Sequence, residues 1–155
     1  MPATRRQFLT AAIGLASLAP LAAFATSAPA IRVLRDPGCG CCGAWIEILR
    51  KDGFTVTEEQ SSNSLLVQFK AGKGIPPQMM SCHTGEIEGY VVEGHVPAAD
   101  IRRLLAERPD AIGLAVPGMP YGSPGMGPED EREAYEVFLI RRDGSTKVFT
   151  KYDAA

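Results

Sequence analysis

The sequence predicts one mixed α/β domain in which strands and helices alternate along the chain. The first observation is a change of hydrophobic period: a short β-prone run is followed by a segment whose apolar residues, Trp45, Ile46 and Leu49, recur at helical spacing. The second is the presence of turn-forming residues, Asp36-Pro37-Gly38 and Asp52-Gly53, at the borders of these segments. The third is length: about 125 residues follow an N-terminal export signal, which suffices for one domain with a core but hardly for two.

The order of the predicted segments is strand, helix, strand, helix, strand and helix, followed by a loop and a hairpin. We expect strands at residues 31–35, 55–59 and 86–93, and helices at residues 42–51, 64–71 and 97–107. Residues 113–128 are too rich in proline and glycine for regular structure, and a loop of that length usually has a function. The chain then ends in a predicted hairpin, 135–142 and 145–152, joined around Asp143-Gly144.

The N-terminal segment has the features of an export signal and is excluded from the fold. Thr4-Arg5-Arg6-Gln7-Phe8-Leu9 is a twin-arginine pattern, and an uncharged run rich in Ala and Leu follows it at residues 10–25. Small residues at the required spacing predict cleavage after Ala25 or after Ala30. A retained membrane anchor is the alternative, but the run is shorter than the ~20 residues that a spanning helix needs, and Pro20 interrupts it.

The predicted organisation is a twin-arginine signal peptide over residues 1–30 and a mature domain over residues 31–155, located in the periplasm. The whole chain has 16 Lys and Arg against 18 Asp and Glu, and removal of Arg5 and Arg6 makes the mature domain more acidic still. Nucleic acid is therefore excluded as a partner. After cleavage we expect a monomer that makes no contact with the membrane.

Three of the four cysteines lie between the first predicted strand and the first predicted helix. Cys39, Cys41 and Cys42 form a Cys-x-x-Cys whose second inner residue is a third cysteine. A dithiol at this place in a βαβ unit is the thioredoxin arrangement. Because the dipole and free N–H groups of a helix N-terminus favour negative charge, we expect depressed pKa values for these thiols. As a redox pair, Cys39 and Cys42 could exchange disulfides with Cys41 as a competitor, whereas in a metal site the third thiol is a further ligand.

The fourth cysteine favours metal binding. In thioredoxin-like folds the segment before the third core strand, which usually carries a cis-proline, returns beside the Cys-x-x-Cys loop, and Ser81-Cys82-His83-Thr84 occupies that position here. We therefore expect four sulfurs to converge. Thiolates suit Cu(I) and can bridge two ions, whereas structural zinc sites draw their ligands from well-spaced pairs, unlike the adjacent Cys41 and Cys42. The prediction is copper, with zinc and plain thiol redox chemistry as the alternatives.

Other side chains are weaker candidates for this site. His83 is a candidate ligand, with the capping of a turn as the alternative, and structural hydrogen bonding is the preferred interpretation of His95. Met119 and Met126 lie in the Pro/Gly loop, where no helical stripe explains them as core, so their thioethers are candidate copper ligands. Trp45 is expected in the core, where its ring can shield the site from water.

Four segments carry a resemblance to a known family: D-P-G-C-G-C-C-G-A-W at 36–45, S-C-H-T at 81–84, G-Y-V-V-E-G-H-V-P at 89–97 and R-P-D-A-I-G-L-A-V-P-G-M-P-Y-G-S-P-G-M at 108–126. With them the chain resembles the CopG-like family of periplasmic copper-resistance and metal-binding proteins, formerly a domain of unknown function. The resemblance implies a thioredoxin-like domain with a C-terminal extension, the Pro/Gly/Met loop and the hairpin, that helps to bind metal. It also implies a cysteine-bridged multicopper cluster and a role in copper redox cycling during detoxification.

The predicted function is periplasmic copper binding in copper resistance, with copper ions and periplasmic copper-efflux or copper-carrier proteins as partners. The predicted ligands are sulfur and imidazole donors: Cys39, Cys41, Cys42, Cys82, His83, Met119 and Met126. Two roles remain open, a copper oxidoreductase that cycles the metal between oxidation states and a passive Cu(I) carrier or buffer. A thiol-disulfide oxidoreductase is the third interpretation.

Overall fold

The computed structural model describes residues 28–155 of the chain. The predicted twin-arginine pattern and the cleavage site after Ala25 lie outside the described residues and stay predictions. Among the helices of the described part, none is long and apolar enough to cross a membrane.

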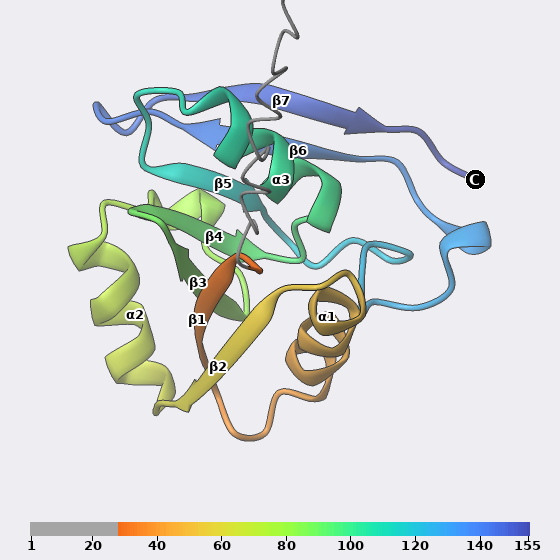
Figure 1. Cartoon of the computed structure of the whole chain (residues 1–155), viewed down its shortest axis with the longest axis horizontal. Helices are drawn as coiled ribbons and strands as arrows, with labels where there is room; N and C mark the ends of the chain where they lie inside the picture. The colour runs from red at the N-terminus through yellow and green to blue at the C-terminus, as the bar shows by residue number, and fades with distance from the viewer. Residues whose placement is uncertain (1–27) are drawn as a thin grey trace, which may run out of the picture.

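Within residues 28–155, three α-helices pack on one seven-stranded sheet (Figure 1). The elements in chain order are β1 (Ala30–Arg35), α1 (Gly40–Lys51), β2 (Thr55–Gln60), α2 (Asn63–Gly72), β3 (His83–Ile87), β4 (Tyr90–Gly94), α3 (Ala98–Glu107), β5 (Gly113–Val116), β6 (Tyr135–Ile140) and β7 (Thr146–Tyr152), with short 3₁₀ turns at Pro77–Met79 and Glu129–Glu131. The strand order is β2-β1-β3-β4-β5-β6-β7. The pairs β1–β2 and β4–β5 are parallel, and the other neighbours are antiparallel. The predicted mixed α/β class is thus confirmed.

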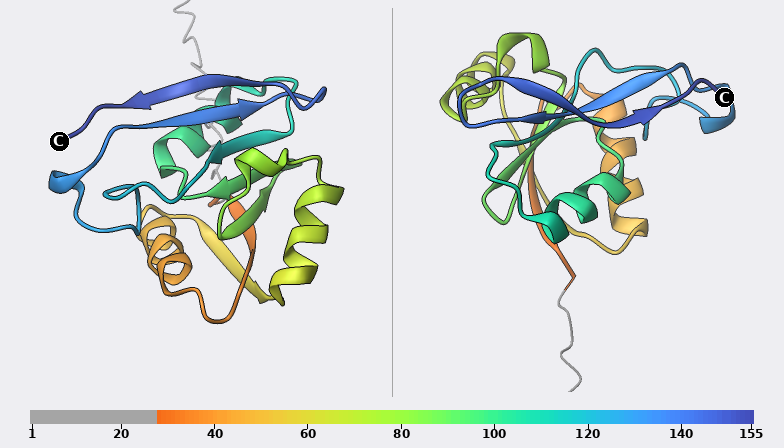
Figure 2. Two further views of the ribbon diagram at one scale, coloured as in Figure 1. Left: turned by 180° about the vertical axis from the view of Figure 1, so that it is seen from behind. Right: turned by 90° about the horizontal axis from the view of Figure 1, so that it is seen from above.

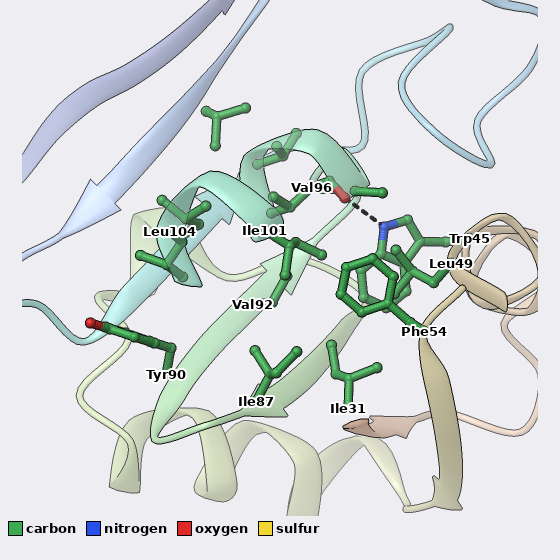
Figure 3. Close-up of a cluster of buried hydrophobic side chains, with 14 of the residues drawn as sticks. Ile31, Trp45, Leu49, Phe54, Ile87, Tyr90, Val92, Val96, Ile101 and Leu104 are labelled. Atoms are coloured by element: carbon green, nitrogen blue, oxygen red, sulfur yellow. Dashed lines mark hydrogen bonds between the residues drawn. The ribbon is translucent and has the colours of Figure 1, made fainter. Parts of the chain in front are cut away.

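The two faces of the sheet carry different cores. The larger core lies beneath α1 and α3 (Figure 2) and includes Trp45, Ile101 and Val92 (Figure 3). Successive strand residues point to opposite faces, so the neighbouring Val91 packs instead in a smaller cluster with Met79, in the segment that follows α2. The sheet is therefore covered on both sides, and the apolar spacing of α1 and α3 is explained by the face that each helix buries.

Two sequence predictions about the middle of the chain are wrong. The expected single strand at 86–93 is a hairpin, β3 and β4, that turns at Glu88 and Gly89, both with positive φ (47° and 87°). Such a two-residue turn matches the twist of the strands, but a glutamate at its first position gives little sequence signal. The expected loop at 113–128 begins with a strand, β5. Its first residue, Gly113, lies so close to β4 that an added Cβ would stand 1.8 Å from the Val91 carbonyl oxygen.

The remaining predicted elements are confirmed to within two residues at each end. The terminal hairpin β6–β7 continues the sheet beyond β5 and is held to α3 by one buried carboxylate. Asp100 accepts hydrogen bonds from the hydroxyls of Thr150 (2.5 Å) and Tyr152 (2.7 Å), and Tyr135 stacks on Tyr152. The C-terminal extension is thus an integral part of the sheet.

Candidate metal centre

A turn before α1 delivers the first cysteine to the start of the helix. Asp36 accepts two hydrogen bonds from the residues after it, at Oδ1 from the Gly38 N–H (2.8 Å) and at its carbonyl from the Cys39 N–H (3.1 Å). Cys39 is the N-cap of α1, which begins two residues earlier than the sequence predicted. Cys41 and Cys42 therefore lie in the first helical turn, where free backbone N–H groups favour negative charge.

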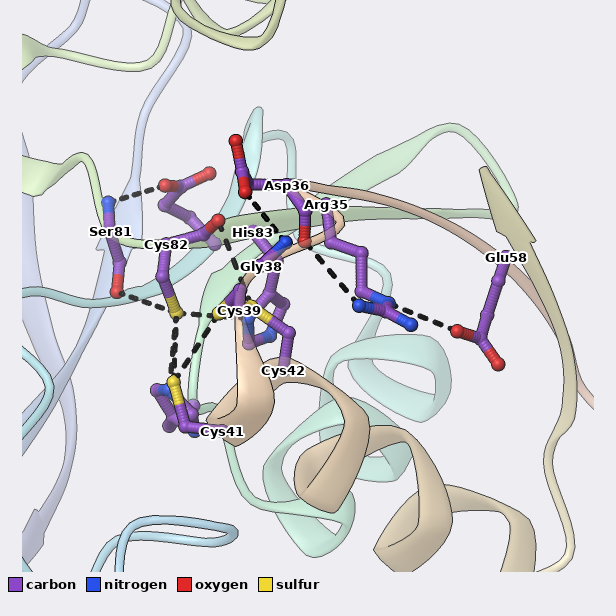
Figure 4. Close-up of a disulfide and its surroundings, with 12 residues drawn as sticks. Arg35, Asp36, Gly38, Cys39, Cys41, Cys42, Glu58, Ser81, Cys82 and His83 are labelled. Atoms are coloured by element: carbon purple, nitrogen blue, oxygen red, sulfur yellow. Dashed lines mark hydrogen bonds and ion pairs between the residues drawn. A yellow bond between two sulfur atoms is a disulfide. The ribbon is translucent and has the colours of Figure 1, made fainter. Parts of the chain in front are cut away.

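Cys39 and Cys42 are joined by a disulfide bond (Figure 4). Cys42 is fully buried, whereas Cys39 is partly exposed. Cys41 keeps a free thiol, and its Sγ lies 3.4 Å from Cys39 Sγ. In this state two of the four predicted thiolate donors are bonded to each other, and two-electron reduction is needed to return them as thiols.

The second cysteine-bearing segment lies beside the first. Cys82 immediately precedes β3, and its Sγ lies 3.9 Å from Cys41 Sγ, although the two residues are 41 positions apart. The Sγ atoms of Cys39, Cys41, Cys42 and Cys82 all lie within 4.8 Å of one another, and we call these four residues the sulfur group. The four sulfurs thus converge as the sequence predicted.

Two buried histidines also approach Cys82. His83 Nδ1 and His95 Nε2 each lie 3.2 Å from Cys82 Sγ, and we call Cys82, His83 and His95 the histidine group. His95 Nδ1 lies 2.8 Å from the carbonyl oxygen of Pro124. Because a carbonyl can only accept, His95 carries its proton on Nδ1 and presents the lone pair of Nε2 to Cys82. A ring nitrogen that donates to a backbone carbonyl is also what orients most metal-binding histidines.

Trp45 covers the histidine group on the core side. Its ring centroid lies 4.3 Å from that of His83, which in turn meets His95 edge-on at 5.0 Å. Trp45 is fully buried and its Nε1–H donates to the Val96 carbonyl at 2.9 Å (Figure 3), so its predicted place in the core is confirmed. His83 Nε2 is the buried side-chain nitrogen or oxygen that has no hydrogen-bond partner in residues 28–155.

Burial sets the protonation of these groups. It raises the pKa of the Cys82 thiol to about 12, and the neighbouring Cys41 adds to the rise. It also lowers the pKa of His83 well below the ordinary value, with smaller contributions from His95 and Lys70, and it lowers that of His95. At neutral pH both imidazoles are therefore neutral and Cys82 is a thiol, so a metal ion that binds Cys82 must displace its proton.

The donors of both groups fit a soft metal ion. Thiolate sulfur and neutral imidazole suit copper and zinc, whereas Mg²⁺ and Ca²⁺ prefer carboxylate and carbonyl oxygen. Neither of the two donor groups found among the described residues contains a carboxylate. The site can therefore bind a thiophilic metal in its reduced state, and it can exchange disulfides through Cys39, Cys41 and Cys42.

Comparisons with known proteins bear on this site. Residues 79–126 match the model of a family described as "Protein of unknown function, DUF411". Two solved structures, named as forms 1 and 2 of copper resistance protein CopG, are each 49% identical to the chain and have a TM-score of 0.75. Each comparison covers 81% of this chain and 98% of the other. The chain belongs to the CopG-like family. Among curated proteins, none matches it.

The Pro/Gly loop of this CopG-like chain reaches the centre through its main chain. The Pro124 carbonyl accepts a hydrogen bond from His95, and Gly125 packs so tightly on α1 that an added Cβ would stand 2.7 Å from the backbone nitrogen of Trp45. Met126 is partly buried beside Gly125, whereas Met119 is 42% exposed and has a φ of 53°. The roles of Met119 and Met126 as ligands stay predictions.

His95 is the residue of this CopG-like site that the sequence did not predict as a ligand. Its predicted structural hydrogen bond is present, but the other ring nitrogen also faces Cys82. Strands β3 and β4 are antiparallel neighbours, so the residue directly after β4 lies beside the residue directly before β3. The histidine in G-Y-V-V-E-G-H-V-P directly follows β4, and this position is the sign that it lies beside Cys82.

Proposed function

We propose that this chain binds copper in bacterial copper resistance, through the sulfur group and the histidine group together. The observation that carries the proposal is the meeting of four cysteine sulfurs and two neutral imidazoles around Cys82, within 4.8 Å in each group. The kinship with proteins named for copper resistance supports copper over other thiophilic metals.

The proposed ligands include every cysteine and the two imidazoles, and the copper site is multinuclear. Cys41 and Cys42 are adjacent on one helix, which makes a single tetrahedral centre awkward but a sulfur-bridged cluster easy. Cys82 is common to both donor groups, and a shared thiolate is the natural bridge between two ions. Met119 and Met126 are proposed to add thioether ligands from the loop.

The domain is proposed to be thioredoxin-like. Three features support this: the strand order β2-β1-β3-β4, with β1 parallel to β2 and antiparallel to β3; a cysteine motif between β1 and α1; and Cys82 directly before β3. Strands β5 to β7 and the Pro/Gly loop form the C-terminal extension.

The proposed role is copper redox interconversion, with passive Cu(I) carriage as the alternative. Bound copper supplies one-electron chemistry, and thiolates favour Cu(I) while imidazoles bind either oxidation state. The buried Trp45 and His83 keep water from one side of the site. Anaerobic metal analysis of the purified mature protein, with optical spectra in both oxidation states, tests the role. We expect a reversible spectral change with copper retained, whereas a site that holds only colourless Cu(I) would indicate carriage.

Export to the periplasm is proposed to use the twin-arginine route, which places the site where copper efflux and carrier proteins work. Replacing both Arg5 and Arg6 by lysine should leave the precursor in the cytoplasm. Cell fractionation measures this, and efficient secretion of the doubly substituted precursor would contradict the assignment.

A second candidate function, thiol-disulfide exchange, is favoured by the Cys39–Cys42 disulfide and by the free Cys41 thiol 3.4 Å from Cys39. Insulin reduction separates it from copper binding, because thiolates that hold copper cannot attack a substrate disulfide. We expect the copper-loaded protein to be nearly inactive. Equal activity of the loaded and metal-free proteins would make disulfide exchange the better assignment.

A further inference from the structure

Two opposite charges lie in the core a short way from Cys82. The side chains of Lys70 on α2 and Glu93 on β4 form an ion pair and are only 2% and 0% exposed. Every other ion pair within residues 28–155 has both partners at least 16% exposed. Burying two charges has a desolvation cost that the attraction between them often does not offset. A contribution to stability therefore does not by itself explain why this pair is buried.

The carboxylate of Glu93 holds the segment that contains Cys82. Besides the Lys70 ammonium, its Oε1 accepts the backbone N–H of Ser81 at 2.5 Å, and its Oε2 accepts the Thr84 hydroxyl at 2.6 Å. Ser81 and Thr84 flank Cys82 and His83 on either side. One carboxylate therefore fixes both ends of the short segment that places the shared thiol.

Lys70 completes this arrangement by fixing the carboxylate itself. Hydrogen bonds to charged groups are stronger than those between neutral groups, and a buried carboxylate with three donors has little freedom to rotate. Packing adds to the constraint, because Gly94 lies so close to Ser81 that an added Cβ would stand 2.7 Å from the Ser81 Cβ. The chain from Ser81 to Thr84 is thus held against β4 by charge and by packing.

We propose that Lys70 and Glu93 are positioning residues for Cys82, which hold its sulfur against Cys41 and the two imidazoles. Neither forms a hydrogen bond to a sulfur of the site, so their hold on the position of Cys82 passes through Ser81 and Thr84. The part of the inference that concerns copper rests on the proposed function, whereas the part that concerns the place of Cys82 does not.

The test replaces the buried pair by apolar side chains of similar size, Lys70→Met together with Glu93→Leu. No charge is then left unpaired in the core, so the fold should survive, but the Ser81 N–H and the Thr84 hydroxyl lose their acceptor. Asp100→Ala is the matched control, because Asp100 is also a buried carboxylate with two hydroxyl donors, Thr150 and Tyr152, and these lie in the terminal hairpin.

The first measurement needs no metal. In a chain that also carries Cys39→Ser and Cys42→Ser, only the thiols of Cys41 and Cys82 remain, with sulfurs 3.9 Å apart. Diamide oxidises them to a disulfide, accepting two electrons and two protons, and mass spectrometry follows the rate. We expect the pair replacement to slow this reaction about tenfold or more, because small misplacements of reacting groups are costly, and we expect Asp100→Ala to leave it unchanged.

The second measurement is Cu(I) affinity, determined in the otherwise unsubstituted reduced chain by competition with a chromogenic Cu(I) chelator. We expect the pair replacement to weaken binding about 10-fold to 100-fold, the range typical when an outer partner of a metal ligand is lost. If the cross-linking slows but the affinity holds, the positioning of Cys82 stands and its role as a copper ligand is overturned.

The inference is overturned if the folded pair replacement cross-links at the wild-type rate, or if Asp100→Ala slows cross-linking as much. Far-UV circular dichroism checks folding. Should the pair replacement not fold, Thr84→Val removes one of the three hydrogen bonds to Glu93 with little change of shape. It should slow cross-linking in the same direction, and a wild-type rate there would also overturn the inference.

Discussion

The sulfur group and the histidine group share Cys82, but they differ in how firmly the fold prepares them. In the sulfur group, Cys39 and Cys42 are bonded to each other, and the free thiols are partly exposed. In the histidine group, both imidazoles are buried and neutral, with His95 held by the Pro124 carbonyl and His83 packed on Trp45. The redox state of the thiols therefore determines how many ligands the sulfur group offers, whereas packing preforms the histidine group.

Substitution of the shared residue should have the largest effect. Serine is nearly the size of cysteine but stays protonated and is a poor ligand for Cu(I), so Cys82→Ser should damage both groups at once. We expect fewer copper ions per chain, a distinct spectrum and an affinity loss beyond the ~10-fold to 100-fold caused by loss of an outer partner. Metal analysis and chelator competition measure these. A folded Cys82→Ser protein with wild-type copper content would mean that the groups do not act together.

The redox state of the sulfur group should have the next largest effect. The oxidised chain lacks the thiols of Cys39 and Cys42, so it should bind fewer Cu(I) ions than the reduced chain. The double substitution Cys39→Ser/Cys42→Ser should show this lower capacity with or without a reductant, as long as Cys41 and Cys82 are kept reduced. Anaerobic titration with thiol counting measures it. Equal capacity in the oxidised and reduced wild-type chains would show that the thiols of Cys39 and Cys42 do not set the copper content.

The histidine group predicts a pH dependence of the metal-free protein. The folded pKa of His83 is lowered, mainly by burial, so below about pH 6.5 the unfolded chain binds a proton that the folded chain does not. The free energy of unfolding should therefore fall as the pH drops below 6.5, by about 1.4 kcal/mol per pH unit for this group. Denaturant unfolding at a series of pH values measures the free energy of unfolding, and the slope is taken below about pH 6.5. His83→Leu is the control and should reduce the slope to the part that the lowered pKa of His95 contributes; an unchanged slope would contradict a neutral buried His83.

The loop methionines should have the smallest effect. A thioether is a neutral donor, so Met119→Leu with Met126→Leu removes sulfur while it keeps volume and apolar character. Because Met119 is largely exposed, we expect the affinity for Cu(I) to fall by about tenfold or less, below the usual cost of an outer partner. Chelator competition and the optical spectrum measure the change. If both were identical to wild type, the two residues would have only structural roles.

The sequence alone was sufficient wherever the cause of the structure is local. Helical spacing of Trp45, Ile46 and Leu49 and the turn signal at Asp36-Pro37-Gly38 predict a strand, a cysteine turn and a helix in that order. The return of Cys82 beside the motif is not local, and it was predicted by analogy with thioredoxin-like folds, in which the segment before the third core strand lies beside the Cys-x-x-Cys loop.

Only the tertiary structure decided which polar groups meet in the core. Lys70, Ser81 and Thr84 come together on Glu93 across separations of 23, 12 and 9 residues, and no periodicity in the sequence marks such a set. The same holds for the two roles of His95 and for β5, whose four residues G-L-A-V become a strand only because β4 and β6 supply hydrogen-bond partners. Spacing along the chain records which face an element buries, but the pairing of buried charges, imidazoles and strands depends on contacts that exist only after the chain has folded.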